Sequence, residues 1–241
     1  MPRKRGTTSC TNAALRHVPR KPRKRYVVYR VNAALQHYAM PFYEYRRLNP
    51  EERRALVQQR IARGFPAHRP PHLERGEGYY LLTAAVYEHK ALIEPAARRD
   101  QFRDALLAAF SPEDGTIEIV AWVVLPNHYH LLAWLPSLRI VAPIFNQLHG
   151  RTSRQWNLED NQQGRKVWYR YSDRAIRNES HFYRAINYIH TNPVRHGYAQ
   201  RSRDWPWSSL EDYIEAMGIE WLEATWRGYP VEDFGGGWDE E

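Results

Sequence analysis

A regular pattern of apolar positions begins at Tyr79 and continues to about residue 191. Short apolar runs bounded by turn residues predict strands, and apolar residues that recur at three- and four-residue spacing predict amphipathic helices. The predicted elements are strand 79–89, helix 95–110, strand 116–124, strand 128–135, helix 140–156, strand 166–172 and helix 181–191.

The order of these elements predicts an α+β fold. Strand, helix, two strands, helix and strand in succession form the ferredoxin-like β-α-β-β-α-β pattern of an antiparallel sheet, here with an extra C-terminal helix. The tripeptide Leu125-Pro126-Asn127 is a tight connection between the middle strands. On helix 140–156, we expect Ile140, Ile144 and Leu148 to form the buried face.

The chain outside this pattern predicts three regions. Residues 1–78 form a basic N-terminal extension, with one helix at 49–64 that begins at Asn49-Pro50 and ends at Gly64, then a linker rich in proline, glycine and charge. Residues 79–213 form the main domain. Residues 214–241 form an acidic C-terminal tail.

Charge is segregated along the chain. Residues 1–43 contain no Asp or Glu, and residues 3–30 carry ten Lys or Arg, whereas residues 211–241 hold ten acids against one base. Charge blocks of this kind are typical of loosely held tails. The net charge of +8 and pI of about 9.6 favour a polyanionic partner, with a solvated basic surface as the alternative.

Composition excludes several classes of protein. Cys10 is the single cysteine, so neither an internal disulfide nor a cysteine-based zinc site is expected. No apolar run of about 18 residues exists, so no membrane span is expected. The N-terminal MPRKRG leads into no apolar segment typical of a signal peptide, and we therefore expect a cytoplasmic protein.

The segment PNHYHLL, residues 126–132, places His128 and His130 two positions apart at the start of a predicted strand. Side chains in a strand alternate between faces, so both imidazoles leave the same face, and the intervening Tyr129 packs on the other. Neutral imidazole is a common metal ligand. Random placement of the histidines would produce about 0.5 His-x-His pairs in a chain of this composition, so further ligands are needed to support a metal site.

The helix in the segment 180–198 supplies those partners. Phe182, Ile186 and Ile189 form its expected core stripe, and a second stripe contains Tyr188 and Asn192. Residues four positions apart project together from a helix. We expect Pro193 to end the helix and to fix Asn192 near its terminus.

Two histidines, an asparagine and a tyrosine in a basic setting indicate phosphodiester chemistry. A divalent ion, Mg²⁺ or Mn²⁺, held by His128, His130 and the amide oxygen of Asn192 would polarise the phosphate. Tyr188 would attack phosphorus and form a covalent phosphotyrosine. A free phenol has a pKa of about 10, so the ion and nearby arginines must activate it.

Other residues are weaker candidates. Tyr183 and Tyr198 are rival nucleophiles, but the first lies on another helix face and the second follows the helix. We expect His190 and His196 to face the surface or DNA rather than a metal, and Trp205 and Trp207 to pack the C-terminal segment on the domain. His149 could contact phosphate or be plainly solvated. Candidate DNA contacts are Arg151, Arg154, Arg184 and Arg195.

Three ordered segments resemble the single-tyrosine HUH transposases, above all those associated with repetitive extragenic palindromes: PNHYHLL (126–132), NYIHTNPVRHGY (187–198) and DWPWSS (204–209). The resemblance covers about residues 79–213. It implies a ferredoxin-like domain that cleaves and rejoins single-stranded DNA at hairpins, with a divalent metal and a 5′-phosphotyrosine intermediate. It matches His128, His130 and Asn192 to metal ligands and Tyr188 to the nucleophile.

Two alternatives stay open. The chain could be a domesticated protein that binds structured DNA without cutting it, for which the basic arm and the aromatic residues would suffice. A replication or plasmid-transfer nickase would use the same chemistry, although DWPWSS and the small domain argue against it. A monomer is favoured, but the oligomeric state, the DNA sequence, the general base and cis or trans use of Tyr188 are not readable from the sequence.

Overall fold

The computed structural model describes residues 51, 58 and 76–235. Of the predicted helix 49–64 it describes only Glu51 and Gln58, and both are helical. The basic arm, most of the linker and the last six residues of the predicted acidic tail lie outside the described residues.

The core of the described part is a four-stranded antiparallel sheet with the order β2-β3-β1-β4. The chain order is strand, helix, two strands, helix, strand, and then further helices, which confirms the predicted α+β class and its β-α-β-β-α-β pattern. The elements are β1 (Gly78–Ala85), α3 (Ala96–Ala109), β2 (Glu118–Val124), β3 (His128–Leu135), α4 (Val141–Glu159) and β4 (Ser172–Ala175).

Two predicted strand boundaries are wrong. β1 stops at Ala85, and Tyr87–His89 form a 3-10 turn in which Glu88 and His89 have positive φ. The predicted strand 166–172 makes one isolated bridge, between Trp168 and Val86, and the regular ladder with β1 begins only at Ser172. The apolar residues of 166–171 reach the core from this irregular segment, which explains why they were mistaken for a strand.

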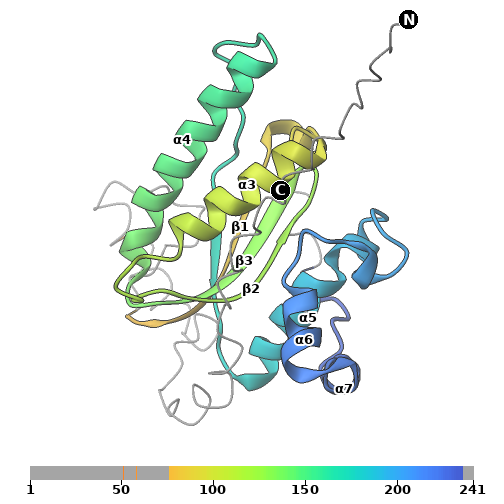
Figure 1. Ribbon diagram of the computed structural model, residues 1–241. Helices are drawn as coiled ribbons and strands as arrows, with labels where there is room; N and C mark the ends of the chain where they lie inside the picture. The colour runs from red at the N-terminus through yellow and green to blue at the C-terminus, as the bar shows by residue number, and fades with distance from the viewer. Residues whose placement is uncertain (1–50, 52–57, 59–75, 236–241) are drawn as a thin grey trace, which may run out of the picture.

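Helices α3 and α4 cover one face of the sheet (Figure 1). The core there joins Leu82 and Leu131 of the sheet to Phe102 of α3 and Trp156 of α4, all 1% exposed or less. This face is rich in aromatic rings, which contribute large buried areas.

The buried face of α4 differs from the predicted one. Ile140 and Ile144 are only partly buried, and Ile140 precedes the helix because Leu138–Ile140 form a 3-10 turn. The buried apolar residues and threonine of α4 are Val141, Phe145, Leu148, Thr152 and Trp156. Leu148 alone belongs to both sets, so the apolar pattern located the helix but not its rotation.

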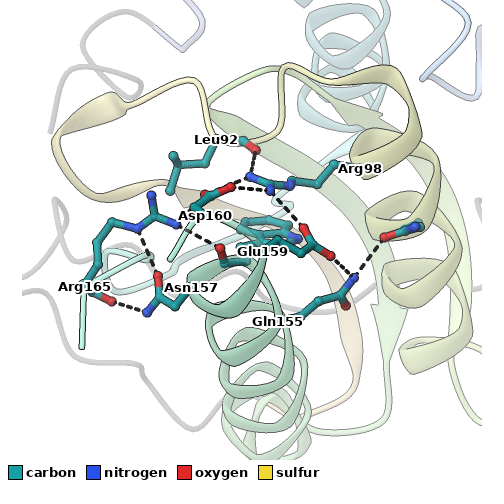
Figure 2. Close-up of polar contacts among 9 residues, drawn as sticks. Leu92, Arg98, Gln155, Asn157, Glu159, Asp160 and Arg165 are labelled. Atoms are coloured by element: carbon teal, nitrogen blue, oxygen red, sulfur yellow. Dashed lines mark hydrogen bonds and ion pairs between the residues drawn. The ribbon is translucent and has the colours of Figure 1, made fainter. Parts of the chain in front are cut away.

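Ionic and amide contacts join the end of α4 to α3 and to the segment that follows (Figure 2). Arg98 donates to Asp160 and to Glu159, and Arg165 donates to Asp160 at 2.7 Å and to Asn157 at 2.9 Å. These bonds from Arg98 and then Arg165 lower the pKa of the Asp160 carboxyl to about 2. Residue 165 is therefore held firmly where the chain leaves α4.

The other face of the sheet is covered by three helices: α5 (Glu179–Arg195), α6 (Leu210–Met217) and α7 (Ile219–Gly228) (Figure 1). Residues 214–217 and 219–228 are therefore helical, rather than part of the loosely held tail that their charge predicted. Leu222 is fully buried, whereas Glu220 and Glu223 are exposed, so the acids occupy the outer surface of packed helices.

The prediction that Pro193 ends the last helix is wrong, because α5 continues to Arg195. The end is set by Gly197, whose φ of +71° suits glycine. Gly197 N–H donates to Val194 O and Tyr198 N–H to Pro193 O, which is the Schellman pattern of helix termination. Pro193 is tolerated because only one hydrogen bond of the last turn is lost.

The DWPWSS segment pairs with the outer edge of β2. Val124 N–H donates to Trp207 O at 2.9 Å, and the indole of Trp205 donates to Val124 O at 3.0 Å. Trp205 is buried and Trp207 partly buried, so the expected packing role is confirmed. No helix among the described residues is long and apolar enough to span a membrane.

Candidate active site

The histidine pair lies where strand alternation places it. His128 and His130 on β3 are 2% and 0% exposed, on the sheet face that α5 covers, and their ring centroids are 5.1 Å apart. The intervening Tyr129 points into the opposite core, as predicted, where its hydroxyl meets Nε2 of His149 at 2.8 Å.

Helix α5 brings the other two predicted residues to this pair. The ring of Tyr188 lies 5.0 Å from that of His130, and Oδ1 of Asn192 lies 3.2 Å from Nε2 of His128. Tyr188 and Asn192 are both fully buried. The four residues proposed from the sequence therefore form one cluster between β3 and α5.

Side chains around the cluster orient the imidazoles. Nδ1 of His130 lies 2.7 Å from Oγ1 of Thr83, and Nδ1 of His128 lies 2.8 Å from Oδ1 of Asn127. When Nδ1 of a histidine donates to such a partner, its Nε2 carries the lone pair that binds a metal.

The donor set fits a divalent cation. Nε2 of His128 lies 3.2 Å from Oδ1 of Asn192, and in the tautomer whose Nδ1–H donates to Asn127 both of these atoms would present lone pairs to a cation. Two neighbouring ligands with bonds of about 2.1 Å at right angles lie about 3 Å apart. Within the described residues no group of three or more His, Cys, Asp or Glu could hold a metal, so a metal held by this histidine pair would need a ligand of another kind, such as the Asn192 amide oxygen.

Two further histidines lie in environments that the sequence did not predict. His190, expected at the surface, is fully buried because its Nε2 meets Ser209 Oγ at 3.0 Å beneath the DWPWSS segment, and burial lowers its pKa to about 3. His196 is exposed, but its ring centroid lies 4.9 Å from that of His128. Its position four residues after Asn192 was the signal that could have placed it beside the site.

The C-terminal segment Val231–Gly235 covers Tyr188. The Phe234 ring lies 5.7 Å from the Tyr188 ring, and Gly235, with φ of +84°, packs its backbone on it. A Cβ at Gly235 would overlap Cε2 of Tyr188 and lie 2.7 Å from its Cζ, so only glycine fits. No local pattern indicates this contact, because it joins residues far apart in the chain.

Two of the four candidate DNA-binding arginines lie beside Tyr188. Arg195 lies over the Tyr188 ring at 5.6 Å and donates to the Glu232 carbonyl at 3.4 Å. Arg184 pairs with the Glu232 carboxylate at 3.5 Å. Arg151 and Arg154 are exposed on α4, which covers the opposite face of the sheet, and their contact with DNA stays a prediction.

The remaining candidates lie outside the cluster. Tyr183 stacks on Tyr229 at 4.7 Å, and Tyr198 stacks on His196 at 6.2 Å beyond the end of α5. His149, considered for phosphate contact, stacks on Trp168 at 4.4 Å in the α4 core instead. Tyr188 is therefore the tyrosine that adjoins the histidine pair.

Comparison with known proteins finds two sequence relatives of the same kind. No family model matches the chain. A REP-associated tyrosine transposase of Escherichia coli (strain K12) is 33% identical over 126 residues, or 52% of this chain and 70% of that protein. A provisionally named REP-associated tyrosine transposase of Haemophilus influenzae is 33% identical over 124 residues, or 47% of this chain and 68% of that protein.

A solved structure of the REP-associated tyrosine transposase bound to a REP hairpin is 25% identical, with a TM-score of 0.49, and covers 61% of this chain and 86% of that one. The sequence relatives span more than two thirds of their own lengths in the alignment. On that identity and coverage, this chain belongs to the family of REP-associated tyrosine transposases.

Proposed function

We propose that this protein cleaves and rejoins single-stranded DNA at hairpins, with a divalent metal and a 5′-phosphotyrosine intermediate, as a step of DNA transposition. The observation that supports this function best is the cluster in which Tyr188 and Asn192 of α5 meet His128 and His130 of β3. The proposed nucleophile and the proposed ligands thereby lie on two packed elements, an arrangement that positioned catalysis requires.

The proposed reaction is a phosphoryl transfer without net hydrolysis. The Tyr188 hydroxyl oxygen attacks the phosphorus of a DNA phosphodiester, its proton leaves, and the bond from phosphorus to O3′ breaks. The released O3′ takes up a proton, and the 5′-phosphate stays on the tyrosine. Attack by a 3′-hydroxyl reverses the step and restores the tyrosine, so no external energy source is needed.

The residues around Tyr188 have distinct roles in this proposal. His128, His130 and Asn192 would hold the divalent ion, which when bound supplies charge stabilisation at the phosphate. Thr83 and Asn127 fix the imidazole orientations. Positioning these partners in advance lowers the cost of assembling the site during the reaction.

Two arginines and the segment Val231–Gly235 control whether DNA can reach the Tyr188 hydroxyl in this proposal. Arg184 and Arg195 lie next to Tyr188 and bind Glu232 in this structure. A DNA phosphate would need the same positive charges. The segment Val231–Gly235 must therefore move away before DNA can reach the Tyr188 hydroxyl.

Hairpin DNA is the proposed partner on chemical grounds. The relatives are named for their association with REP sequences, and a palindromic single strand folds back into a hairpin. The net charge of +8 favours a polyanion, and phosphate contacts supply most sequence-independent affinity.

Trapping a covalent adduct tests the proposal. A labelled hairpin oligonucleotide with flanking single strands is incubated with Mn²⁺ or Mg²⁺ and either the full chain or a chain that ends at Pro230, and is then separated under denaturing conditions. We expect an adduct that Tyr188→Phe abolishes and that the matched variants Tyr183→Phe and Tyr198→Phe retain.

The same assay separates the proposal from the non-catalytic alternative. A binding protein would retain hairpin affinity in chelator and with His128→Ala, and would form no adduct with either chain length across a panel of hairpins. An adduct that survives Tyr188→Phe would overturn the nucleophile assignment.

A further inference from the structure

An aromatic cluster lies just beyond the end of β1, next to the candidate active site. Tyr87 and Tyr169 have ring centroids 4.9 Å apart, and the His89 ring lies 5.7 Å from Tyr169. Nζ of Lys166 lies over the Tyr87 ring at 4.2 Å and 5.5 Å from the Tyr169 centroid. Neither the family resemblance nor the proposed chemistry uses these residues.

Backbone pairing brings the two tyrosines together. Tyr87 N–H donates to Val167 O at 2.7 Å, and Tyr169 N–H donates to Ala85 O at 2.9 Å. The segment that carries Tyr169 is anchored where it leaves α4 by Arg165 (Figure 2). The cluster is therefore a fixed feature of the fold rather than a chance contact of two loose loops.

The alternation of side chains along an extended chain places the Tyr87 and Tyr169 rings toward the sheet face that carries the candidate active site. Val86 and Trp168 form a bridge, and both belong to the core beneath α3 and α4. Tyr87 and Tyr169 follow them directly, so they lie toward the opposite face, which is the face of His128.

The register sets the cluster close to the ligands. Ala85, which precedes Val86, is the direct partner of His128 in the sheet. Tyr87 lies two residues beyond Ala85, which corresponds to about 7 Å along an extended chain. A DNA strand whose phosphate reaches His128 would therefore pass this cluster within a nucleotide or two.

Tyr87 and Tyr169 lack the complete burial and the hydroxyl hydrogen bonds that are usual for a tyrosine with a structural role. Both rings are only partly buried, and within the described residues neither hydroxyl makes a hydrogen bond. By contrast, Tyr129 and Tyr213 are fully buried and bond through their hydroxyls. A tyrosine pair that serves only packing would be expected to resemble those two.

The backbone at the cluster is strained. Glu88 and His89 have φ of 56° and 51°, a conformation that non-glycine residues rarely adopt and that is unusual at two positions in succession. Such strain is commonly retained at binding sites, where it fixes a ligand-contacting geometry. Here it turns the chain so that His89 reaches the Tyr169 ring.

We infer that Tyr87 and Tyr169, with Lys166 beside them, form a stacking platform for an unpaired base of the DNA strand that enters the active site. Aromatic faces bind bases of any sequence, and a lysine among them adds phosphate attraction. This inference rests on the proposed DNA-processing function, because it names where the single-stranded part of the substrate lies.

Equilibrium binding without cleavage tests the platform. In a Tyr188→Phe background with chelator, fluorescence anisotropy compares a blunt hairpin with the same hairpin carrying single-stranded extensions. We expect Tyr87→Leu and Tyr169→Leu each to weaken binding of the extended hairpin roughly tenfold, with less than about a twofold change for the blunt hairpin. Tyr87→Trp should restore the affinity, because indole also stacks.

The chain offers a matched control in the pair Tyr183–Tyr229, stacked at 4.7 Å beside the acidic Glu179 rather than a lysine. Tyr229→Leu should leave the affinity for both hairpins unchanged. Equal weakening of blunt and extended hairpins by Tyr87→Leu, or no weakening of either, would overturn the platform. Thermal unfolding of each variant confirms that the fold is retained.

A second measurement needs no variant at the cluster. An extended hairpin carrying 2-aminopurine at successive unpaired positions reports stacking by loss of fluorescence. One position should be quenched by the Tyr188→Phe protein, and the absence of quenching at every position would contradict the platform. Because neither assay involves cleavage, its result is independent of whether Tyr188 forms an adduct.

Discussion

Helices α4 and α5 pack on opposite faces of one sheet and are similar in length, with 19 and 17 residues. They differ in how completely their buried polar atoms are hydrogen-bonded. On α4, Thr152 accepts from the Trp168 indole, and Asn157 bonds Arg165 with both ends of its amide. On α5, four buried side-chain atoms make no hydrogen bond within the described residues: Arg184 Nε, Asn187 Oδ1, His190 Nδ1 and Asn192 Nδ2.

The difference separates a helix that stabilises the fold from one that serves a site. Buried polar atoms are nearly always bonded in folded proteins, and each unsatisfied one costs about 1–3 kcal/mol. α4 follows that rule, and α5 departs from it repeatedly within three turns. We interpret the departure as a cost retained on the helix that carries the proposed nucleophile and a proposed metal ligand.

A large truncation on the α4 face should destabilise the protein more than any change on α5. Trp156 is 1% exposed and packs on Phe102 and Trp168, so Trp156→Ala should lower the free energy of unfolding by about 3–5 kcal/mol. Urea denaturation measures this loss. Leu158→Ala, on the same helix but 55% exposed, is the control and should change stability by less than about 0.5 kcal/mol.

On the α5 side the expected loss is in binding rather than in stability. Asn192→Ala removes a proposed ligand and should weaken Mn²⁺ binding at least about 100-fold, or about 3 kcal/mol, as titration calorimetry would show. The unfolding free energy should change by about 1 kcal/mol or less, because Nδ2 makes no hydrogen bond within the described part of the chain.

Asn157→Ala on α4 is the matched control for that result. It removes two bonds to Arg165 and should lower stability while leaving Mn²⁺ affinity unchanged. Tight Mn²⁺ binding by Asn192→Ala, together with a large loss of stability, would show that Asn192 serves the fold instead.

The sequence predicted the arrangement of the candidate site residues more completely than their surroundings. Alternation alone placed His128 and His130 on one face, and helical spacing placed Tyr188 with Asn192, because both rules are local. The apolar stripe predicted for this helix is the buried face of α5, where Phe182, Ile186 and Ile189 are 2% exposed or less.

What the sequence could not predict depends on contacts between distant residues. Gly235 covers Tyr188 although it lies 47 positions further along the chain, and no local pattern reports that contact. His190 was expected at the surface because its bond to Ser209 depends on how the DWPWSS segment pairs with β2. The C-terminal acids suggested a loose tail, since composition does not reveal that α6 and α7 carry an apolar face.

His149, packed in the α4 core, should make the free energy of unfolding depend on pH. Burial lowers the pKa of His149 from 6.5 to about 3, so the folded protein keeps this imidazole neutral while the unfolded chain binds a proton below pH 6.5. The stability contributed by neutral His149 is therefore present above pH 6.5 and is lost as the pH falls. Between pH 7 and 5 the expected loss is about 2 kcal/mol.

His149→Phe identifies that contribution. The variant should retain its stability between pH 7 and 5 better than the wild type by the same amount, measured by urea denaturation at each pH. An unchanged pH dependence would mean that the stacked imidazole between Phe145 and Trp168 is protonated in the fold.

Removing a single hydroxyl from each of the two helices should change the free energy of unfolding only slightly. Thr152→Val keeps the shape of the side chain but leaves the buried Trp168 indole without its acceptor, which should cost about 1–2 kcal/mol in urea denaturation. Thr191→Val on α5 removes a hydroxyl whose hydrogen bond, among the described residues, is to the Asn187 carbonyl of its own helix, so a cost of about 0.5 kcal/mol or less is expected. Equal costs would mean that side-chain bonding across the core does not distinguish the two helices, and the contrast between α4 and α5 would then rest on the atoms around Tyr188 alone.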